Sequence, residues 1–126
     1  MSSAEFWRLV DHLGIPDTGA LELIGYPGKL PASGKRPRFR LTTLQTRRVN
    51  ALKEVGTALE AINEAPAWLR RRSHSAPFSG RTPLEIMIAG GAEGISEVMD
   101  TVTRLALRRS LHRRDGPREK PDSRGT

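Results

Sequence analysis

Residues 78–91 read FSGRTPLEIMIAGG, and this stretch specifies both ends of a short helix. At its start, the Thr82 hydroxyl can accept a hydrogen bond from the backbone N–H of Glu85, and the Glu85 carboxylate can accept one from the backbone N–H of Thr82. Pro83 suits the first helical position, where its missing N–H donor costs nothing. The two glycines that close the stretch allow left-handed backbone, so we expect the helix to end after about two turns.

Most of the surface of this short helix is apolar. Its apolar residues are Leu84, Ile86, Met87 and Ile88. A helix with so little polar surface must be covered by other elements on most sides, so we expect it to lie in the core. We assign a fold-determining role to the residues that start, fill and end it: Gly80, Thr82, Pro83, Leu84, Glu85, Gly90 and Gly91.

The flanking sequence predicts further helices and an all-α fold. Apolar residues recur at helical spacing over residues 4–13, over a second short stretch that Gly25 ends, and over residues 41–62, the longest helix expected. A final amphipathic helix follows the glycine pair. We therefore expect a small helical bundle with an N-terminal helix-turn-helix-like region (1–40), a helical domain (41–110) and a disordered basic tail (111–126).

Length, charge and composition limit the function classes. The 126 residues suit one compact domain, and the absence of cysteine excludes disulfides, thiolate metal sites and a cysteine nucleophile. The chain does not start with a basic segment followed by an apolar run, and no apolar stretch approaches the roughly 18 residues that span a bilayer. We therefore expect a cytoplasmic protein without a membrane partner.

The formal net charge of +7 includes a run of cations in the first half of the chain. Residues 26–40 contain three prolines and two glycines, which disfavour a long helix. From residue 29 to residue 48 every charged side chain is a cation. Two interpretations remain open: a solvated basic loop, or a DNA-binding segment that contacts phosphates. The candidate DNA-binding residues are Lys29, Lys35, Arg36, Arg38, Arg40, Arg47 and Arg48.

The order of motifs after residue 41 is similar to that of a known family. A long helix, the Trp68-Leu69 pair, a proline- and serine-containing loop, the box at residues 80–85, the glycine pair and a final helix follow one another. This order resembles the toxin-binding domain of the Xre/MbcA/ParS-type bacterial antitoxins. Family members usually carry a recognition helix upstream, whereas this chain has the proline-rich basic segment at residues 26–40.

The resemblance implies a function and a set of partners. It implies an antitoxin of a type II toxin-antitoxin system that forms a homodimer, neutralises a RES-domain NAD-degrading toxin and represses its operon by binding operator DNA. The C-terminal end of the chain would then block the toxin cleft. The candidate toxin-interface residues are Trp68, Arg70, Arg71, Arg81, Arg104, Arg108, Arg109 and Asp115. Trp68 has a second interpretation, as a core residue packed on the central helix, and the arginines as a solvated rim.

The sequence does not predict an enzyme. The three histidines (His12, His74 and His112) are scattered, and none has a second potential metal ligand at a suitable helical spacing. No nucleophile elbow, phosphate-binding glycine loop or carboxylate pair is present. We therefore expect no catalytic residue, no metal, no cofactor and no small-molecule substrate. The alternative function is a DNA-binding transcriptional regulator or partition-like protein without a toxin partner.

Overall fold

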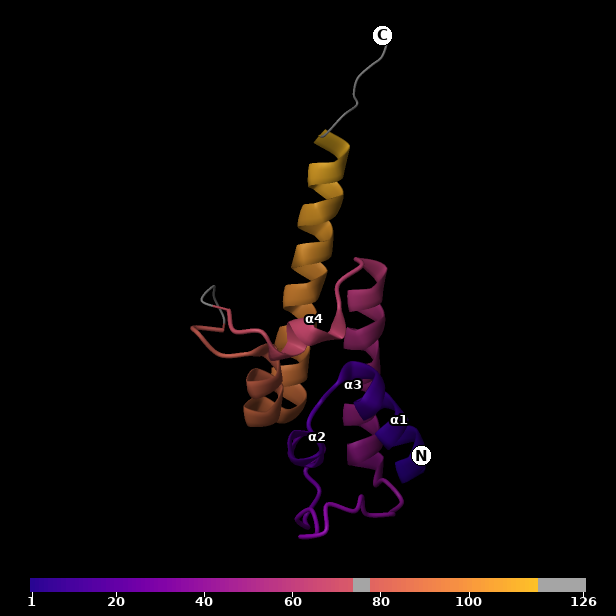
Figure 1. The fold of residues 1–126 in the computed structure, drawn as a ribbon. Helices are drawn as coiled ribbons and strands as arrows, with labels where there is room; N and C mark the ends of the chain where they lie inside the picture. Colours follow the sequence, from indigo (N-terminus) through magenta and orange to yellow (C-terminus); the bar gives the residue numbers. More distant parts are fainter. Residues whose placement is uncertain (74–77, 116–126) are drawn as a thin grey trace.

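The computed structural model describes residues 1–73 and 78–115, with side chains described as far as Leu111. Its elements are the α-helices α1 (Ser3–Leu13), α2 (Asp17–Leu23), α3 (Thr43–Ala61) and α4 (Pro83–Asp115), and the 3-10 helix η1 (Pro66–Arg70). Within the described part of the chain, β-structure is limited to isolated bridges between residues 2 and 40 and between residues 73 and 81. The expected all-α fold is confirmed (Figure 1).

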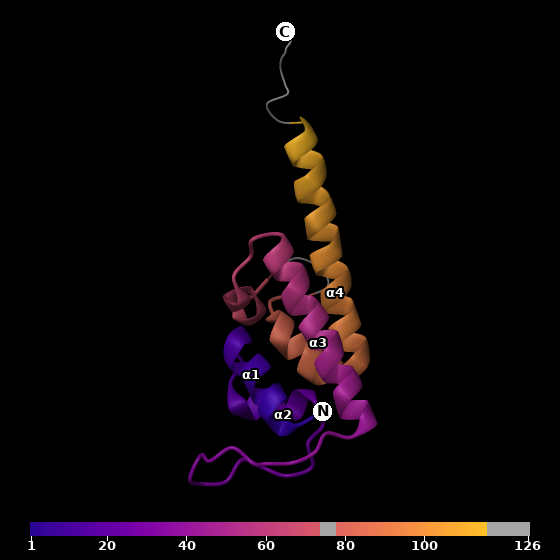
Figure 2. The ribbon, with the colours of Figure 1, turned by 90° about the vertical axis from the view of Figure 1, so that its right-hand side faces the viewer.

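The helices pack together into one elongated molecule. α3 and α4 pack side by side, α1 packs on α3, and α2 packs on α4. Both ribbon views show α1, α2 and the arm after α2 at one end, with the second half of α4 projecting from the other (Figures 1 and 2). One apolar core includes residues from both halves of the chain; its fully buried members include Phe6, Leu13, Leu52, Leu69, Met87 and Val98.

The capping box that starts α4 is present. The Glu85 N–H donates to the Thr82 hydroxyl at 3.0 Å, and the Thr82 N–H donates to the Glu85 carboxylate at 2.8 Å. These bonds lower the pKa of Glu85. Gly91 has φ 59° and ψ −131°, a conformation that only glycine adopts readily, so α4 consists of two helical segments that meet there. The expected two-turn helix that ends at the glycine pair is therefore confirmed.

α4 extends further than its sequence pattern indicated. α4 continues to Asp115, whereas the tail was expected to begin at residue 111, and its 33 residues exceed the 19 of α3. Leucine and arginine dominate this stretch and favour helix, and no glycine or proline occurs between Gly94 and Gly116. The rest of the expected tail, residues 116–126, and His74 lie outside the described residues.

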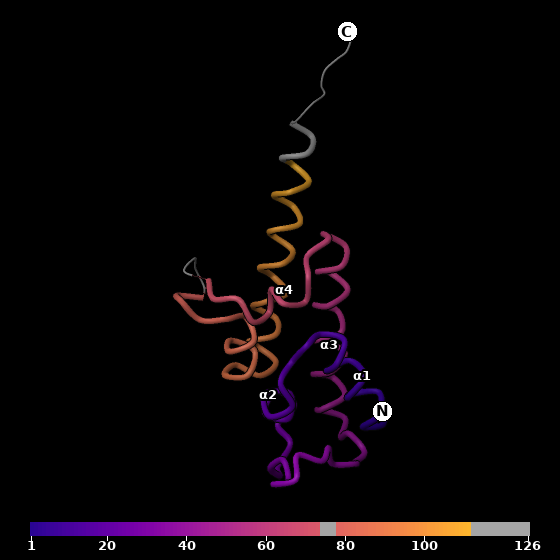
Figure 3. The backbone as a smooth tube through the Cα atoms, viewed as in Figure 1, coloured from indigo at the N-terminus to yellow at the C-terminus, as the bar shows by residue number. Residues whose placement is uncertain are grey.

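Residues 26–40, the arm, contain turns but no helix, as their prolines predict. The arm returns along the start of α1, where the Ser3 N–H donates to the Phe39 carbonyl and the Phe39 N–H donates to the Ser3 hydroxyl, both at 3.2 Å. The backbone trace shows the arm passing beneath α1 and α2 before it enters α3 (Figure 3). None of the described helices combines the length and the apolar character that a membrane crossing needs.

Candidate interaction surfaces

Arg36 links the arm to α1 and α2 through ion pairs. Its guanidinium donates two hydrogen bonds to Asp11, at 2.6 and 3.1 Å, and two to Asp17, at 2.9 and 3.1 Å. The same guanidinium lies 4.6 Å above the Trp7 ring, and the Trp7 indole N–H donates to the Pro37 carbonyl at 3.2 Å. Because two carboxylates compensate its charge, the Arg36 side chain is a structural link, and its assignment to DNA binding stays a prediction.

This link predicts a pH effect. The hydrogen bond from Arg36 lowers the pKa of Asp11 from its ordinary value of 3.8, so the stabilisation is present above that value and is lost as pH falls through the lowered pKa. We expect Arg36→Gln to return the pKa of Asp11 to its ordinary value, measured by NMR titration of the side-chain carboxyl carbon. An unchanged Asp11 pKa in Arg36→Gln would contradict the assigned cause.

Arg48 also has a structural position. One guanidinium nitrogen, Nη1, donates to the Leu23 carbonyl at 3.3 Å, and the guanidinium lies beside Gly25 and Gly91. Arg48 therefore connects the end of α2 to the corner within α4. Its Nε is buried without a hydrogen-bond partner. The side chain is half-buried, so Arg48 is less accessible to a phosphate than an exposed cation, and its assignment to DNA binding stays a prediction.

The other predicted DNA-binding residues are exposed and form no ion pair with any described carboxylate: Lys29, Lys35, Arg38, Arg40 and Arg47. They are distributed over the arm and the first turns of α3. Figures 1 and 2 place this segment at the end of the molecule opposite the projecting part of α4. These five exposed cations of the predicted DNA-binding set therefore share one end of the molecule.

Arg109 joins α4 to the connection between α3 and η1. It donates to the Ile62 carbonyl at 2.7 Å and to the Glu64 carboxylate at 2.8 Å, and Arg71 lies 3.7 Å from the same carboxylate. The Glu64 side chain is only 15% exposed. Arg109 therefore attaches the projecting segment of α4 to the α3–η1 connection, and its assignment to the toxin interface stays a prediction.

Trp68 packs inside the fold. It is half-buried, and its ring meets the buried Phe78 ring edge-on, with the centroids 6.2 Å apart. The Arg70 guanidinium lies against Gly14 at the end of α1. This geometry favours the structural interpretation of Trp68. Part of the Trp68 side chain remains exposed.

The remaining predicted toxin-interface arginines, Arg81, Arg104 and Arg108, are exposed, and none of them pairs with a described carboxylate. Arg104 donates to the Thr101 hydroxyl at 3.4 Å. The side chain of Asp115 lies outside the described part, although its backbone is helical.

The sequence did not predict that two leucines on the projecting part of α4 are exposed. Leu107 is 59% exposed and Leu111 is 49% exposed. Leu105 and Ala106, between α4 and the body, are less exposed. The available signal was the spacing: residues 107 and 111 are one helical turn apart and out of phase with the buried residues Ile95, Val98 and Val102.

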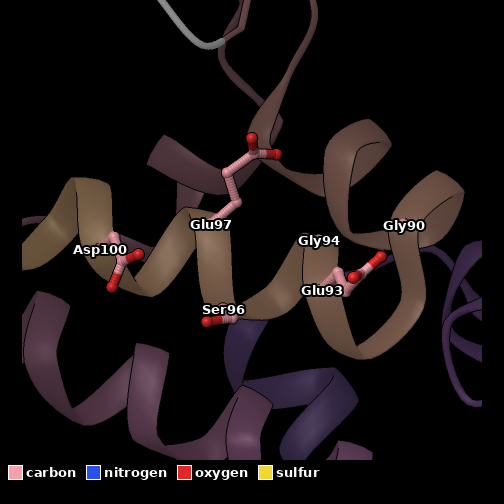
Figure 4. Close-up of a pocket in the computed structure, with 6 residues that line it drawn as sticks. All are labelled: Gly90, Glu93, Gly94, Ser96, Glu97 and Asp100. Carbon is pink, nitrogen blue, oxygen red and sulfur yellow. The ribbon is translucent and has the colours of Figure 1, made fainter.

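A hollow lined by acidic side chains lies at the start of the second segment of α4. It measures about 490 Å³, follows the Gly91 corner and is lined by Gly90, Glu93, Gly94, Ser96, Glu97 and Asp100 (Figure 4). Gly94 is buried because the backbone of Ile86 and Met87 passes directly over it. Among the described residues, no group of three or more histidine or carboxylate side chains is arranged to hold a metal ion.

Comparison with known proteins adds no assignment, since no family model, curated protein or solved structure matches the chain.

Proposed function

We propose that the chain is an antitoxin that binds a RES-domain NAD-degrading toxin and blocks its cleft with the C-terminal end of α4. The supporting observation is that α4 projects past the end of α3 and exposes Leu107 and Leu111 (Figure 2). A projecting helix with exposed leucines is suited to burial against another protein. The motif order from Trp68 to the final helix supports the choice of a toxin as that protein.

The proposed inhibition is steric and electrostatic. A cleft that binds the pyrophosphate of NAD offers positive charge or backbone donors, so the Asp115 carboxylate is the group of α4 best suited to enter it. Arg108, which is exposed one helical turn after Arg104, then contacts the rim of the toxin cleft. Arg109 keeps the base of the helix rigid through Glu64, which reduces the entropy lost on binding. An interface of the standard size, about 1,600 Å² in total, would exclude NAD.

We expect deletion of residues 112–126 to abolish inhibition. The deletion removes the end of α4 and leaves Leu107, Leu111 and the core in place. The measurement is NAD hydrolysis by the toxin encoded in the adjacent reading frame, titrated with full-length or shortened chain. The matched control is Lys35→Ala with Arg38→Ala, which alters exposed cations at the far end and is expected to inhibit fully. Equal inhibition by the shortened and full-length chains would refute the proposed contact.

A second activity, DNA binding for autorepression, is supported by the exposed cations of the arm. Arg36 fixes the arm by pairing with Asp11 and Asp17, so Lys35 and Arg38 are presented on ordered backbone. Cations without carboxylate partners attract phosphates and displace counterions, which gives affinity with little base recognition.

For this second activity we expect a steep dependence on salt. Each phosphate contact contributes about −0.9 to the slope of log K against log salt concentration. Lys35→Ala with Arg38→Ala is therefore expected to reduce the magnitude of the slope by roughly 1.8 for duplex DNA from the chain's own upstream region. The control is Arg104→Ala with Arg108→Ala, which is expected to leave the slope unchanged. Binding that does not respond to salt would contradict the proposal.

A further inference from the structure

The outward face of the first half of α3 carries polar side chains in helical register. Thr43, Arg47, Asn50 and Glu54 are separated by four, three and four positions, so they lie on one face of the helix. All four side chains are exposed, and the buried residues of α3, among them Leu52, lie on the opposite face. The polar face is therefore open to another molecule.

Arg47 and Asn50 have no partner that explains their positions. Within the described part of the chain, neither side chain forms a hydrogen bond or an ion pair with another group. Arg48, the next residue after Arg47, instead donates to the Leu23 carbonyl. Arg47 and Asn50 are thus presented to solvent by a helix that its buried face holds in the fold.

We propose that this face of α3 enters the major groove of duplex DNA, with Arg47 bound to a guanine and Asn50 bound to an adenine. The inference rests on the proposed DNA-binding activity and adds base recognition to it. Guanine presents two hydrogen-bond acceptors in the major groove, which match the guanidinium of arginine. Adenine presents one acceptor and one amino group there, which match the amide of asparagine. Each pairing uses two hydrogen bonds and so identifies one base.

The dimensions of α3 suit this contact. The major groove of B-form DNA is about 12 Å wide and admits one α-helix. Residues 43–50 extend over roughly 10 Å along the helix, which corresponds to about three base pairs. The major groove of duplex RNA is too narrow for side chains to read its bases, so the face fits DNA.

Charged residues on either side limit where the DNA lies. Arg38 and Arg40 are exposed immediately before α3, and Figure 3 shows the arm that carries them running into the start of this helix. Their guanidinium groups can bind the phosphates that border the groove. Glu54, one turn after Asn50 on the same face, repels phosphates. The contact is therefore confined to the first turns of α3.

Base analogues test the two contacts. Duplexes that the full-length chain selects from a randomised pool are expected to share a guanine and an adenine within about three base pairs. Replacing guanine by 7-deazaguanine removes one of its two acceptors in the major groove. We expect this replacement to weaken binding of the natural chain by about tenfold, measured by fluorescence anisotropy, and to leave binding of Arg47→Ala unchanged. The adenine analogue, 7-deazaadenine, is expected to weaken binding of the natural chain and not of Asn50→Ala.

Salt dependence separates base recognition from phosphate binding. Asn50 is uncharged, so Asn50→Ala is expected to lose the preference for selected over scrambled duplexes and to keep the salt slope of the natural chain. The control is Arg104→Ala, which removes an exposed arginine at the other end of the molecule and is expected to keep both the preference and the slope. Helix content by circular dichroism is expected to be the same in all variants.

The possible failures can be told apart. Salt-dependent binding without preference among duplexes would overturn the base contacts and leave phosphate binding by the arm in place. Analogue effects that persist in Arg47→Ala and Asn50→Ala would also overturn them, because another part of the chain would then read the bases. A chain that binds no duplex at low salt would overturn both the base contacts and the proposed DNA-binding activity.

Discussion

Gly94→Ala is expected to lower the free energy of unfolding by about 3 kcal/mol, at the upper end for over-packing. A Cβ at this position would collide with the Ile86 carbonyl and come within 3.0 Å of the Met87 Cα. Both neighbours are backbone atoms of the first segment of α4, so no side-chain rotation can relieve the clash. The two segments of α4 would have to separate at the corner that positions the projecting helix. Urea unfolding followed by circular dichroism measures the change.

Gly90→Ala is the matched control for this substitution. Gly90 is exposed, and no atom lies within 4 Å of the position that its Cβ would occupy. Alanine there removes the helical penalty of glycine, so we expect unchanged stability or a gain of up to about 1 kcal/mol. If the alanine variants at positions 90 and 94 unfolded at the same urea concentration, the close contact of the two segments would be excluded.

Arg109→Ala is expected to lower the free energy of unfolding by about 2 kcal/mol. The substitution removes charge-assisted hydrogen bonds to Glu64 and to the Ile62 carbonyl. It leaves a mostly buried carboxylate with Arg71, at 3.7 Å, as its remaining cation. The loss is therefore larger than for an exposed ion pair, whose contribution is usually below about 1 kcal/mol.

Arg108→Ala provides the comparison for Arg109→Ala, because the neighbouring arginine is exposed and lacks a carboxylate partner. We expect its stability to stay within about 0.5 kcal/mol of the natural chain. A double-mutant cycle with Glu64→Ala then isolates the coupling between Glu64 and Arg109. A coupling energy near zero would show that Arg109 does not hold α4 to the α3–η1 connection.

The parts of the fold that sequence predicts well are those in which the interacting groups are close in the chain. The Thr82–Glu85 box and the end of the helix at Gly91 depend on residues a few positions apart. The turn after α1 is similar, because Gly14 has φ 68°. Local backbone chemistry therefore sufficed for these features.

The roles of the cations could not be predicted in the same way. Arg36 and Asp11 are 25 residues apart, and Arg109 and Ile62 are 47 residues apart, so only the packed chain shows which arginines have partners. In the sequence alone, the arginines of a basic run cannot be distinguished from one another. Two of the seven proposed DNA-binding residues, Arg36 and Arg48, and one proposed toxin-interface residue, Arg109, contact a carboxylate or carbonyl within the fold. The exposure of Leu107 and Leu111 likewise depends on where α3 ends.

The most direct test of the account is the NAD-hydrolysis rate of the RES-domain toxin from the adjacent reading frame, measured as purified full-length chain is added. We expect the rate to fall to background when the chain reaches a fixed stoichiometric ratio to toxin, with no NAD consumed by the chain alone. A toxin that stays fully active in excess chain, or an adjacent frame that encodes no protein of this class, would contradict the proposed antitoxin function.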